Sequence, residues 1–245
     1  MSDTFRTLEA YWRQADVPGS KTVMTKRYGY SPHQWMGNKD HPSLLANDPD
    51  VAWIHKHYSD EISRHDIIDG LGSDSPDQST LDRRMLIASL MWGYGTSVGR
   101  HYRLRDICSF LSDQKTKTRL SKSRNCLASK DIGGAYKEFC DINGIGSAFF
   151  TKFLYFSGKS MDMDEFPLIL DTKVSWSLAS LSGYRRFVRS DHRPLSDSDG
   201  FCRYVSTMHG WAQRLGAACE IIEFVLWRDV DTIDQFALDW YKKNG

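Results

Sequence analysis

Two glycines separated by one apolar residue, Gly144 and Gly146, stand between two segments of helical character. Glycine is favoured where the backbone takes a positive φ or approaches another surface closely. Ile142 and Ile145 would anchor such a turn against both helices. The N–H groups at the start of the second helix would then point outward, where the helix dipole also favours an anion. The pattern predicts a phosphate site made of backbone, formed by Asn143, Gly144, Ile145, Gly146 and Ser147.

Basic side chains gather just before this turn. Residues 115–137 carry seven Lys or Arg against a single acid, Asp131, whereas acids concentrate at 40–82 and 229–239. Clustered cations on a chain with a net charge of only +1 indicate a phosphate-binding face. A solvated helix face is the alternative interpretation. The side chains that we assign to nucleic-acid binding are Lys115, Lys117, Arg119, Lys122 and Arg124.

The elements that would position these groups have the pattern of helices. Residues 85–92 are apolar on nearly every side, which is typical of a buried helix, with Ser79 or Thr80 as its cap. Residues 217–228 have the pattern of a second central helix. There is no sustained strand alternation and no internal repeat, so the sequence predicts an all-α fold. Further helices are expected at residues 7–14, 104–112, 115–128, 131–140, 147–157, 171–182, 197–214 and 232–243.

Length and composition set the outer bounds. A chain of 245 residues can form one large domain or two small lobes around a shared cleft. No apolar run approaches the roughly 20 residues needed to cross a bilayer, and the first residues lack the pattern of a secretory signal. We therefore expect a cytoplasmic protein with no membrane partner.

The five cysteines give no support for a metal centre. They are widely spaced, and no Cys-x-x-Cys pair occurs, so neither a zinc site nor an iron–sulfur cluster is indicated. Reduced thiols, mostly buried, are the expectation. His55 and His57 form a close pair without a neighbouring Cys or acidic ligand in helical register, and we interpret them as surface residues.

Two stretches carry a family resemblance. Residues 135–152 resemble the helix-hairpin-helix motif, and residues 166–174 are similar to the Val-Asp-Thr-His-Val signature of the helix-hairpin-helix glycosylase superfamily. This superfamily includes endonuclease III and the 8-oxoguanine glycosylases. The resemblance covers residues 80–228 and implies two helical lobes, with the hairpin and an acid facing a cleft between them. Residues 1–75 would pack on a glycosylase-like core formed by residues 76–245.

The resemblance implies a catalytic role for Asp171. Breaking an N-glycosidic bond creates positive charge on the sugar, and a carboxylate close to C1′ stabilises that charge and can activate a water or an amine. Asp171 would also be a favourable helix N-cap, a role worth about 1 kcal/mol. The two roles are compatible, because a helix N-terminus keeps an acid ionised.

Members of the superfamily that also cut the strand carry a lysine near the start of the second hairpin helix, which attacks C1′ and forms a Schiff base. A dry pocket favours such an amine. The usual position, two residues after the second glycine, is Ala148 here, which is a departure from the pattern. Lys152 lies one helical turn later on the same face and could recover the reach. Binding of phosphate by Lys152 and a water-dependent reaction without any lysine are the alternatives, and Lys173 is a weaker candidate amine.

Access to a base in duplex DNA requires that the base is flipped out of the stack. Aromatic residues near the expected cleft could stack on it, although packing in the core is their more usual role. The chain lacks the four-cysteine cluster of many endonuclease III relatives. No cofactor is expected apart from a monovalent cation that hairpin carbonyls could hold. The aromatic candidates are Trp35, Trp92, Phe149, Phe150 and Trp176.

Three hypotheses for the function remain open at this stage. The first is a monomeric DNA glycosylase, with or without lyase activity at abasic sites, that excises an oxidised or otherwise modified base from double-stranded DNA. The second is a catalytically inactive helix-hairpin-helix DNA-binding protein in DNA repair or anti-phage defence. The third is a helical protein unrelated to DNA, in which the two glycines form a plain tight turn.

Overall fold

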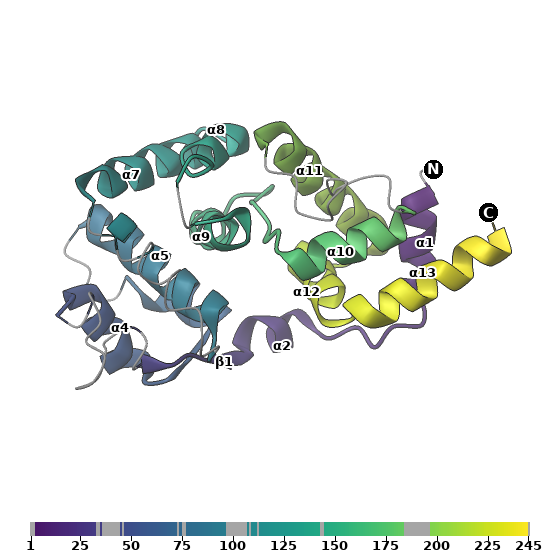
Figure 1. Cartoon of the computed structure of the whole chain (residues 1–245), viewed down its shortest axis with the longest axis horizontal. Helices are drawn as coiled ribbons and strands as arrows, with labels where there is room; N and C mark the ends of the chain where they lie inside the picture. Colours follow the sequence, from purple (N-terminus) through teal and green to yellow (C-terminus); the bar gives the residue numbers. More distant parts are fainter. Residues whose placement is uncertain are drawn as a thin grey trace. The chain divides into compact units, whose positions relative to one another are not determined.

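The computed structural model describes residues 3–32, 35, 45, 47–72, 74, 77–96, 107, 109–111, 113–142, 145–183 and 197–244. These residues are mostly helical, which confirms the predicted all-α fold (Figure 1). The chain divides into two compact units. Unit 1 comprises Met1–Val23 and Pro167–Gly245, and unit 2 comprises Met24–Phe166. The boundary expected at residue 75 lies inside unit 2.

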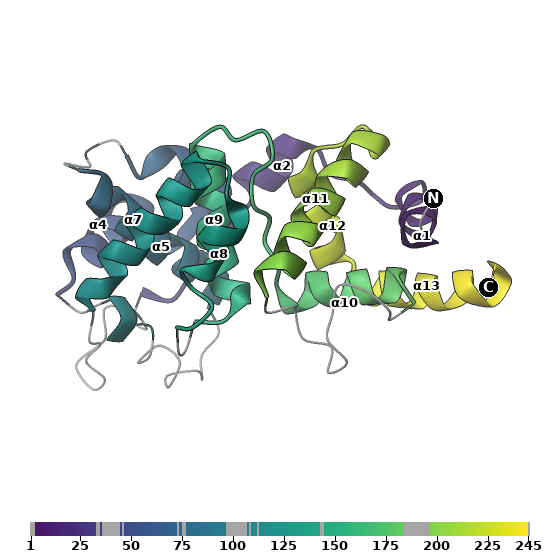
Figure 2. The same ribbon diagram turned by 90° about the horizontal axis from the view of Figure 1, so that it is seen from above.

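The centre of unit 2 is a pair of packed helices, α5 and α9. The apolar run predicted for α5 is buried from Met85 to Met91, and α9 is buried from Phe150 to Gly158. Figure 2 shows α5, α7 and α9 side by side within this unit. Its helices are α4 (Pro49–Tyr58), the π-helical turn η1 (Asp66–Gly70), α5 (Gln78–Tyr94), α7 (Gln114–Ala128), α8 (Ile132–Lys137) and α9 (Ser147–Ser160).

A small antiparallel sheet completes unit 2. Strands β1 (Arg27–Gly29) and β2 (Glu61–Ser63) pair through Tyr28 and Ile62 at their centres. The sequence analysis did not predict these strands, because three residues are too few to produce a visible alternation. Helix α2 (Ser20–Thr25) contains the boundary between the two units.

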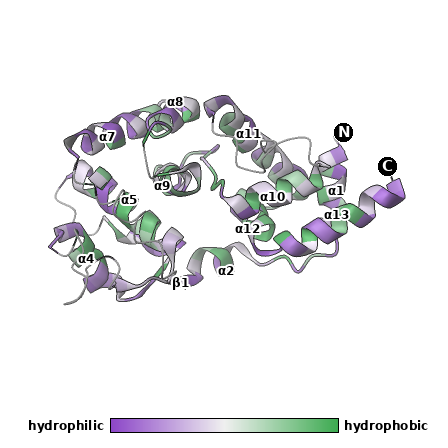
Figure 3. Ribbon diagram, viewed as in Figure 1, coloured by the Kyte–Doolittle hydropathy of each residue, from purple (hydrophilic) through white to green (hydrophobic). Residues whose placement is uncertain are grey.

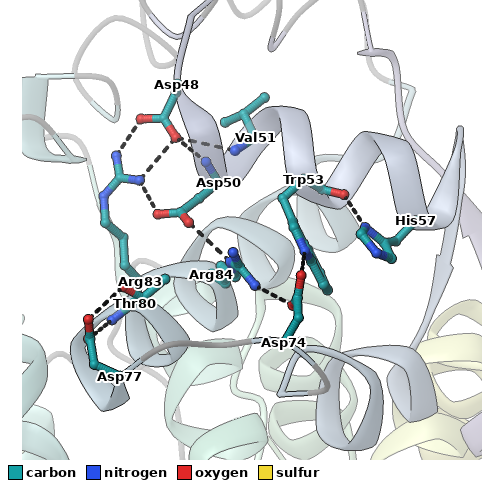
Figure 4. Close-up of polar contacts among 10 residues, drawn as sticks. All are labelled: Asp48, Asp50, Val51, Trp53, His57, Asp74, Asp77, Thr80, Arg83 and Arg84. Atoms are coloured by element: carbon teal, nitrogen blue, oxygen red, sulfur yellow. Dashed lines mark hydrogen bonds and ion pairs between the residues drawn. The ribbon is translucent and has the colours of Figure 1, made fainter.

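Charged side chains fasten α4 to α5 (Figure 4). Arg83 binds Asp48 through two hydrogen bonds of 2.5 and 3.0 Å and Asp50 through one of 2.5 Å. Arg84 donates to the other oxygen of Asp50 at 3.1 Å, and its guanidinium lies 4.2 Å from the centroid of the Trp53 ring. These side chains are largely buried, so each charge needs its partner.

Unit 1 is organised around α10, which packs against α12, α13 and α1. The Ser177 hydroxyl donates to the Leu226 carbonyl at 2.5 Å, and the Tyr204 hydroxyl donates to the Ile169 carbonyl at 2.8 Å. The predicted central helix at residues 217–228 is confirmed, and it is buried from Cys219 to Leu226. The helices of this unit are α1 (Asp3–Trp12), α10 (Thr172–Leu181), α11 (Ser198–Leu215), α12 (Cys219–Arg228) and α13 (Val230–Asn244).

Several helix predictions need correction at their ends. The cap of α5 is Asp77, whose carboxylate accepts the Thr80 N–H at 2.8 Å, and not Ser79 or Thr80. Helix α8 ends at Lys137, earlier than the predicted residue 140. The helix expected at 104–112 falls largely outside the described residues. Within the described part of the chain, no helix is long and apolar enough to cross a bilayer.

Candidate functional site

The predicted phosphate site lies at the N-terminus of α9. Gly146 is the N-cap of this helix and is exposed, with extended backbone angles (φ −79°, ψ 168°). Ile145 is buried and anchors the turn, as predicted, whereas Asn143 and Gly144 lie outside the described residues. No side chain of the described residues caps α9, although aspartates cap α4, α5, α7, α8, α10 and α11. Among the described residues, the first amides of α9 thus have no side-chain acceptor, a feature that a phosphate site also has.

The basic helix α7 is amphipathic. Thr116, Leu120, Ser123 and Leu127 recur at helical spacing and are buried. Figure 3 shows that hydrophilic residues make up most of this helix. Three of the side chains predicted to bind nucleic acid are exposed on it: Lys115, Lys117 and Lys122.

Arg119 connects α7 to the segment that leads into the turn. Its guanidinium binds both carboxylate oxygens of Asp141, at 2.6 and 3.0 Å, and the Glu138 carbonyl at 2.7 Å. The hydrogen bonds from Arg119 lower the pKa of Asp141, and the same bonds raise the pKa of Arg119. The charge of Arg119 is thus largely neutralised within the protein, and the side chain holds the chain before the hairpin in place.

Arg124 is engaged in a similar way. Its Nη1 lies 3.4 Å from Oδ1 of Asp82, a buried residue of α5 that also accepts a hydrogen bond of 2.8 Å from Gln78. Burial raises the pKa of Asp82, although the hydrogen bond from Gln78 and the positive charge of Arg124 act in the opposite direction. Arg124 therefore serves the packing of α7 on α5.

Lys152 occupies a closed environment between α9 and α5. The residue is only 6% exposed, and its Nζ donates to the carbonyl of Ala148. The ammonium also lies 5.7 Å from the centroid of the Phe149 ring. The side chain folds back toward the N-terminus of α9, so that the amine contacts the first turn of this helix through the Ala148 carbonyl oxygen.

Asp171 is the N-cap of α10, as predicted. Its Oδ1 accepts the Val174 N–H at 3.0 Å, and its main-chain carbonyl accepts the Ser175 hydroxyl at 2.8 Å. The residue is partly exposed, so the carboxylate retains access to solvent. The cap engages one of the two carboxylate oxygens. Asp171 belongs to unit 1, whereas Lys152, α7 and the turn belong to unit 2.

Lys173, the weaker candidate amine, is exposed on the first turn of α10. Its Nζ lies 4.8 Å from the centroid of the Trp227 ring, a favourable contact between a cation and an aromatic face.

The candidate stacking aromatics divide into core and surface residues. Trp35 and Phe150 are buried, and Trp92 packs against Tyr28 with a ring-centroid distance of 5.2 Å. Phe149 is partly exposed and stacks on the Tyr94 ring at 5.1 Å. Trp176 is 38% exposed. Trp176 is thus the most exposed of these candidates, whereas Phe149 and Trp92 are partly exposed.

The sequence analysis missed two features of the site. The clamp between Arg119 and Asp141 could have been suspected from their opposite charges, but residues 22 positions apart have no fixed relation in sequence. Gly93 lies in the last turn of α5, beside Lys152. A glycine inside an otherwise helical pattern is the signal that could have indicated a close contact.

The described residues contain no group of three or more His, Cys, Asp or Glu side chains arranged to hold a metal ion. The hairpin carbonyls that could hold a monovalent cation include those of Asn143 and Gly144, which lie outside the described residues. The cation therefore stays a prediction.

A glycine before α9 and a basic helix linked to the segment that leads into it are features of helical proteins that bind phosphate. The chain matches, over residues 21–227, the model of the family described as "Putative 8-oxoguanine DNA glycosylase OGG-like protein". It therefore belongs to this family, as the sequence resemblance predicted. Neither the search of curated proteins nor the search of solved structures gave a match.

Proposed function

We propose that the protein is a DNA glycosylase that removes an oxidised or otherwise modified base from double-stranded DNA, with Asp171 and Lys152 as its catalytic residues. The observation that carries this proposal is the placement of Lys152. A lysine that is 6% exposed, with its amine folded back to the first turn of α9, has the dry environment that favours a nucleophilic amine. Family membership supports a DNA substrate.

In the proposed reaction, the Lys152 amine attacks C1′ as the bond between C1′ and the base nitrogen breaks. The base leaves with the bonding electron pair and takes up a proton, and the amine loses one. The Asp171 carboxylate stabilises the positive charge that develops on the sugar. Opening of the sugar ring then gives a Schiff base. The turn at Gly146 and the exposed lysines of α7 hold the phosphates and contribute no base readout.

Borohydride trapping on a duplex that contains 8-oxoguanine tests this proposal, because reduction converts the Schiff base into a stable adduct. Lys152→Ala should abolish the adduct, and Asp171→Asn should abolish base release while salt-sensitive DNA binding persists. An undiminished adduct in Lys152→Ala would reassign the amine, with Lys173→Ala as the matched variant. Full base release by Asp171→Asn would refute the catalytic assignment.

A second candidate function has its own support. The hydrogen bond from Lys152 to the Ala148 carbonyl and the burial of its side chain are also what a purely structural lysine would have. In that case the protein is a catalytically inactive DNA-binding member of the family, acting in repair or in defence against foreign DNA. Binding to duplex DNA without base release, on substrates with oxidised bases and with phage-type modifications, would favour this alternative.

A further inference from the structure

Gly93 lies in the last turn of α5, in contact with Lys152 of α9. A Cβ atom built on Gly93 would lie 2.7 Å from Cδ, 2.9 Å from Cε and 3.7 Å from Nζ of Lys152. Carbon atoms in favourable contact are about 3.5–4.0 Å apart. Any other residue at this position would therefore push the Lys152 side chain out of its place.

The backbone gives no reason for this glycine. Among the described glycines, positive φ angles occur at Gly95, Gly183 and Gly216, and not at Gly93. Glycine also weakens a helix relative to alanine, because it has more conformational freedom to lose on folding. The requirement at position 93 is therefore for space, and the side chain that uses the space is Lys152.

Two groups of α9 contact the amine of the Lys152 side chain whose aliphatic part fills the space beside Gly93. The Phe149 ring, 5.7 Å from Nζ, is held by stacking on Tyr94, the residue after Gly93, at a centroid distance of 5.1 Å and an angle of 28°. The Ala148 carbonyl accepts the hydrogen bond from Nζ. Gly93 lies next to the aliphatic part of the Lys152 side chain. The Phe149 ring and the Ala148 carbonyl lie next to the charged end of that side chain.

We propose that Gly93 is a positioning residue, which sets where the Lys152 amine is delivered by leaving a slot for its aliphatic chain. The inference rests on the proposed function, in which that amine attacks the sugar. A methyl group at position 93 would displace the amine from the first turn of α9. It would leave unchanged the turn at Gly146 and the exposed lysines of α7, which hold the DNA.

The test compares Gly93→Ala with Gly210→Ala. Both replace a glycine inside a helix, but a Cβ on Gly210 would meet no atom within 4 Å. The measurements are the single-turnover rate of borohydride trapping at saturating duplex and the Kd for the same duplex. Displacing a reacting group by about 1 Å can slow a reaction by roughly 100-fold. Gly93→Ala should therefore trap roughly 100-fold more slowly with its Kd unchanged, whereas Gly210→Ala should match the wild type.

A double-mutant cycle with Lys152→Ala separates positioning from a general structural effect. Alanine at position 93 should lower the melting temperature of the wild type, because it clashes with Lys152. The same substitution should raise the melting temperature of the Lys152→Ala variant, because the clash is gone and alanine favours the helix. This change of sign does not depend on activity, and it is measurable through the double variant even if Gly93→Ala alone folds poorly.

The outcomes distinguish the inference from the proposed function. A wild-type trapping rate in Gly93→Ala, combined with loss of the adduct in Lys152→Ala, would overturn the role of Gly93 alone. Equal destabilisation by Gly93→Ala in both backgrounds would also overturn it. If the wild-type protein forms no adduct, or if Lys152→Ala retains it, the proposed amine is wrong and the positioning role falls with it.

Discussion

The three exposed lysines of α7 should carry most of the salt dependence that this helix contributes to DNA binding. Lys115, Lys117 and Lys122 are exposed, whereas Arg119 is bound to Asp141 in the protein. Each lysine that neutralises a DNA phosphate contributes about −0.9 to the slope of log K against log salt. Replacing all three lysines with alanine should therefore make the slope less steep by about 2.7.

This change in slope corresponds to a measurable change in affinity. Between 50 and 200 mM salt, a fourfold change, one phosphate contact accounts for about a 3.5-fold loss of affinity, and three contacts account for about 40-fold. Fluorescence anisotropy with an undamaged duplex, at several salt concentrations, gives the slope for each variant. The triple variant should lose affinity at low salt and converge on the wild type at high salt.

Arg119→Gln provides the matched control on the same helix. Because its guanidinium already binds the Asp141 carboxylate at 2.6 and 3.0 Å, the substitution should change the slope by much less than one exposed lysine does. If Arg119→Gln reduces the slope as much as a lysine substitution, the ion pair does not neutralise the charge. If the triple lysine variant keeps the wild-type slope, α7 does not bind phosphate.

Three further predictions concern the turn and the stability of unit 2. Gly146→Val should weaken duplex binding in anisotropy with little change in melting temperature, because a Cβ on Gly146 would meet no atom within 4 Å and the added methyl groups would stand beside the first amides of α9. Unchanged binding would remove the turn from the interface. Arg84→Met should lower the free energy of unfolding, measured in urea, by about 3 kcal/mol, because it leaves the buried Asp50 with fewer partners. A loss below about 1 kcal/mol would mean that Arg83 alone is enough to compensate the charge of Asp50. Burial by itself would raise the pKa of Asp48, but hydrogen bonds and the charge of Arg83, with backbone amides, outweigh burial and lower it. A carboxyl group whose pKa is lowered by folding stabilises the protein above its pKa in the unfolded chain, and this stabilisation is lost as the pH falls through its pKa in the folded protein. The melting temperature of Asp48→Asn should therefore fall less steeply than that of the wild type as the pH is lowered.

The network around Arg83 and Arg84 also explains where the acids of the chain lie. The sequence shows acids concentrated at residues 40–82, away from the basic cluster. In the structure, Asp48 and Asp50 bind the two arginines of α5, and Asp77 caps the same helix. These acids serve the internal packing of α4 against α5, so the near-neutral net charge of the chain is compatible with a basic face on α7.

Local sequence signals determined much of this protein. The density of apolar residues at 85–92 and 217–228 predicted two buried helices, because a helix that is apolar on nearly every side must be covered by other elements. The order of an apolar stretch, Asp171 and a helix was enough to predict an N-cap, since capping depends on neighbours within one turn. The start of α9 directly after Gly146 was likewise predicted from adjacent residues.

Tertiary structure decided what distant residues do to one another. In the sequence, Arg119 and Arg124 belong to the same basic cluster as Lys115. Only the packing shows that they pair with Asp141 and Asp82, because an ion pair depends on where side chains from different parts of the chain meet. The environment of Lys152 is decided in the same way. Its hydrogen bond to Ala148 lies within one helix, but the space that it fills exists because Gly93, on another helix, has no side chain.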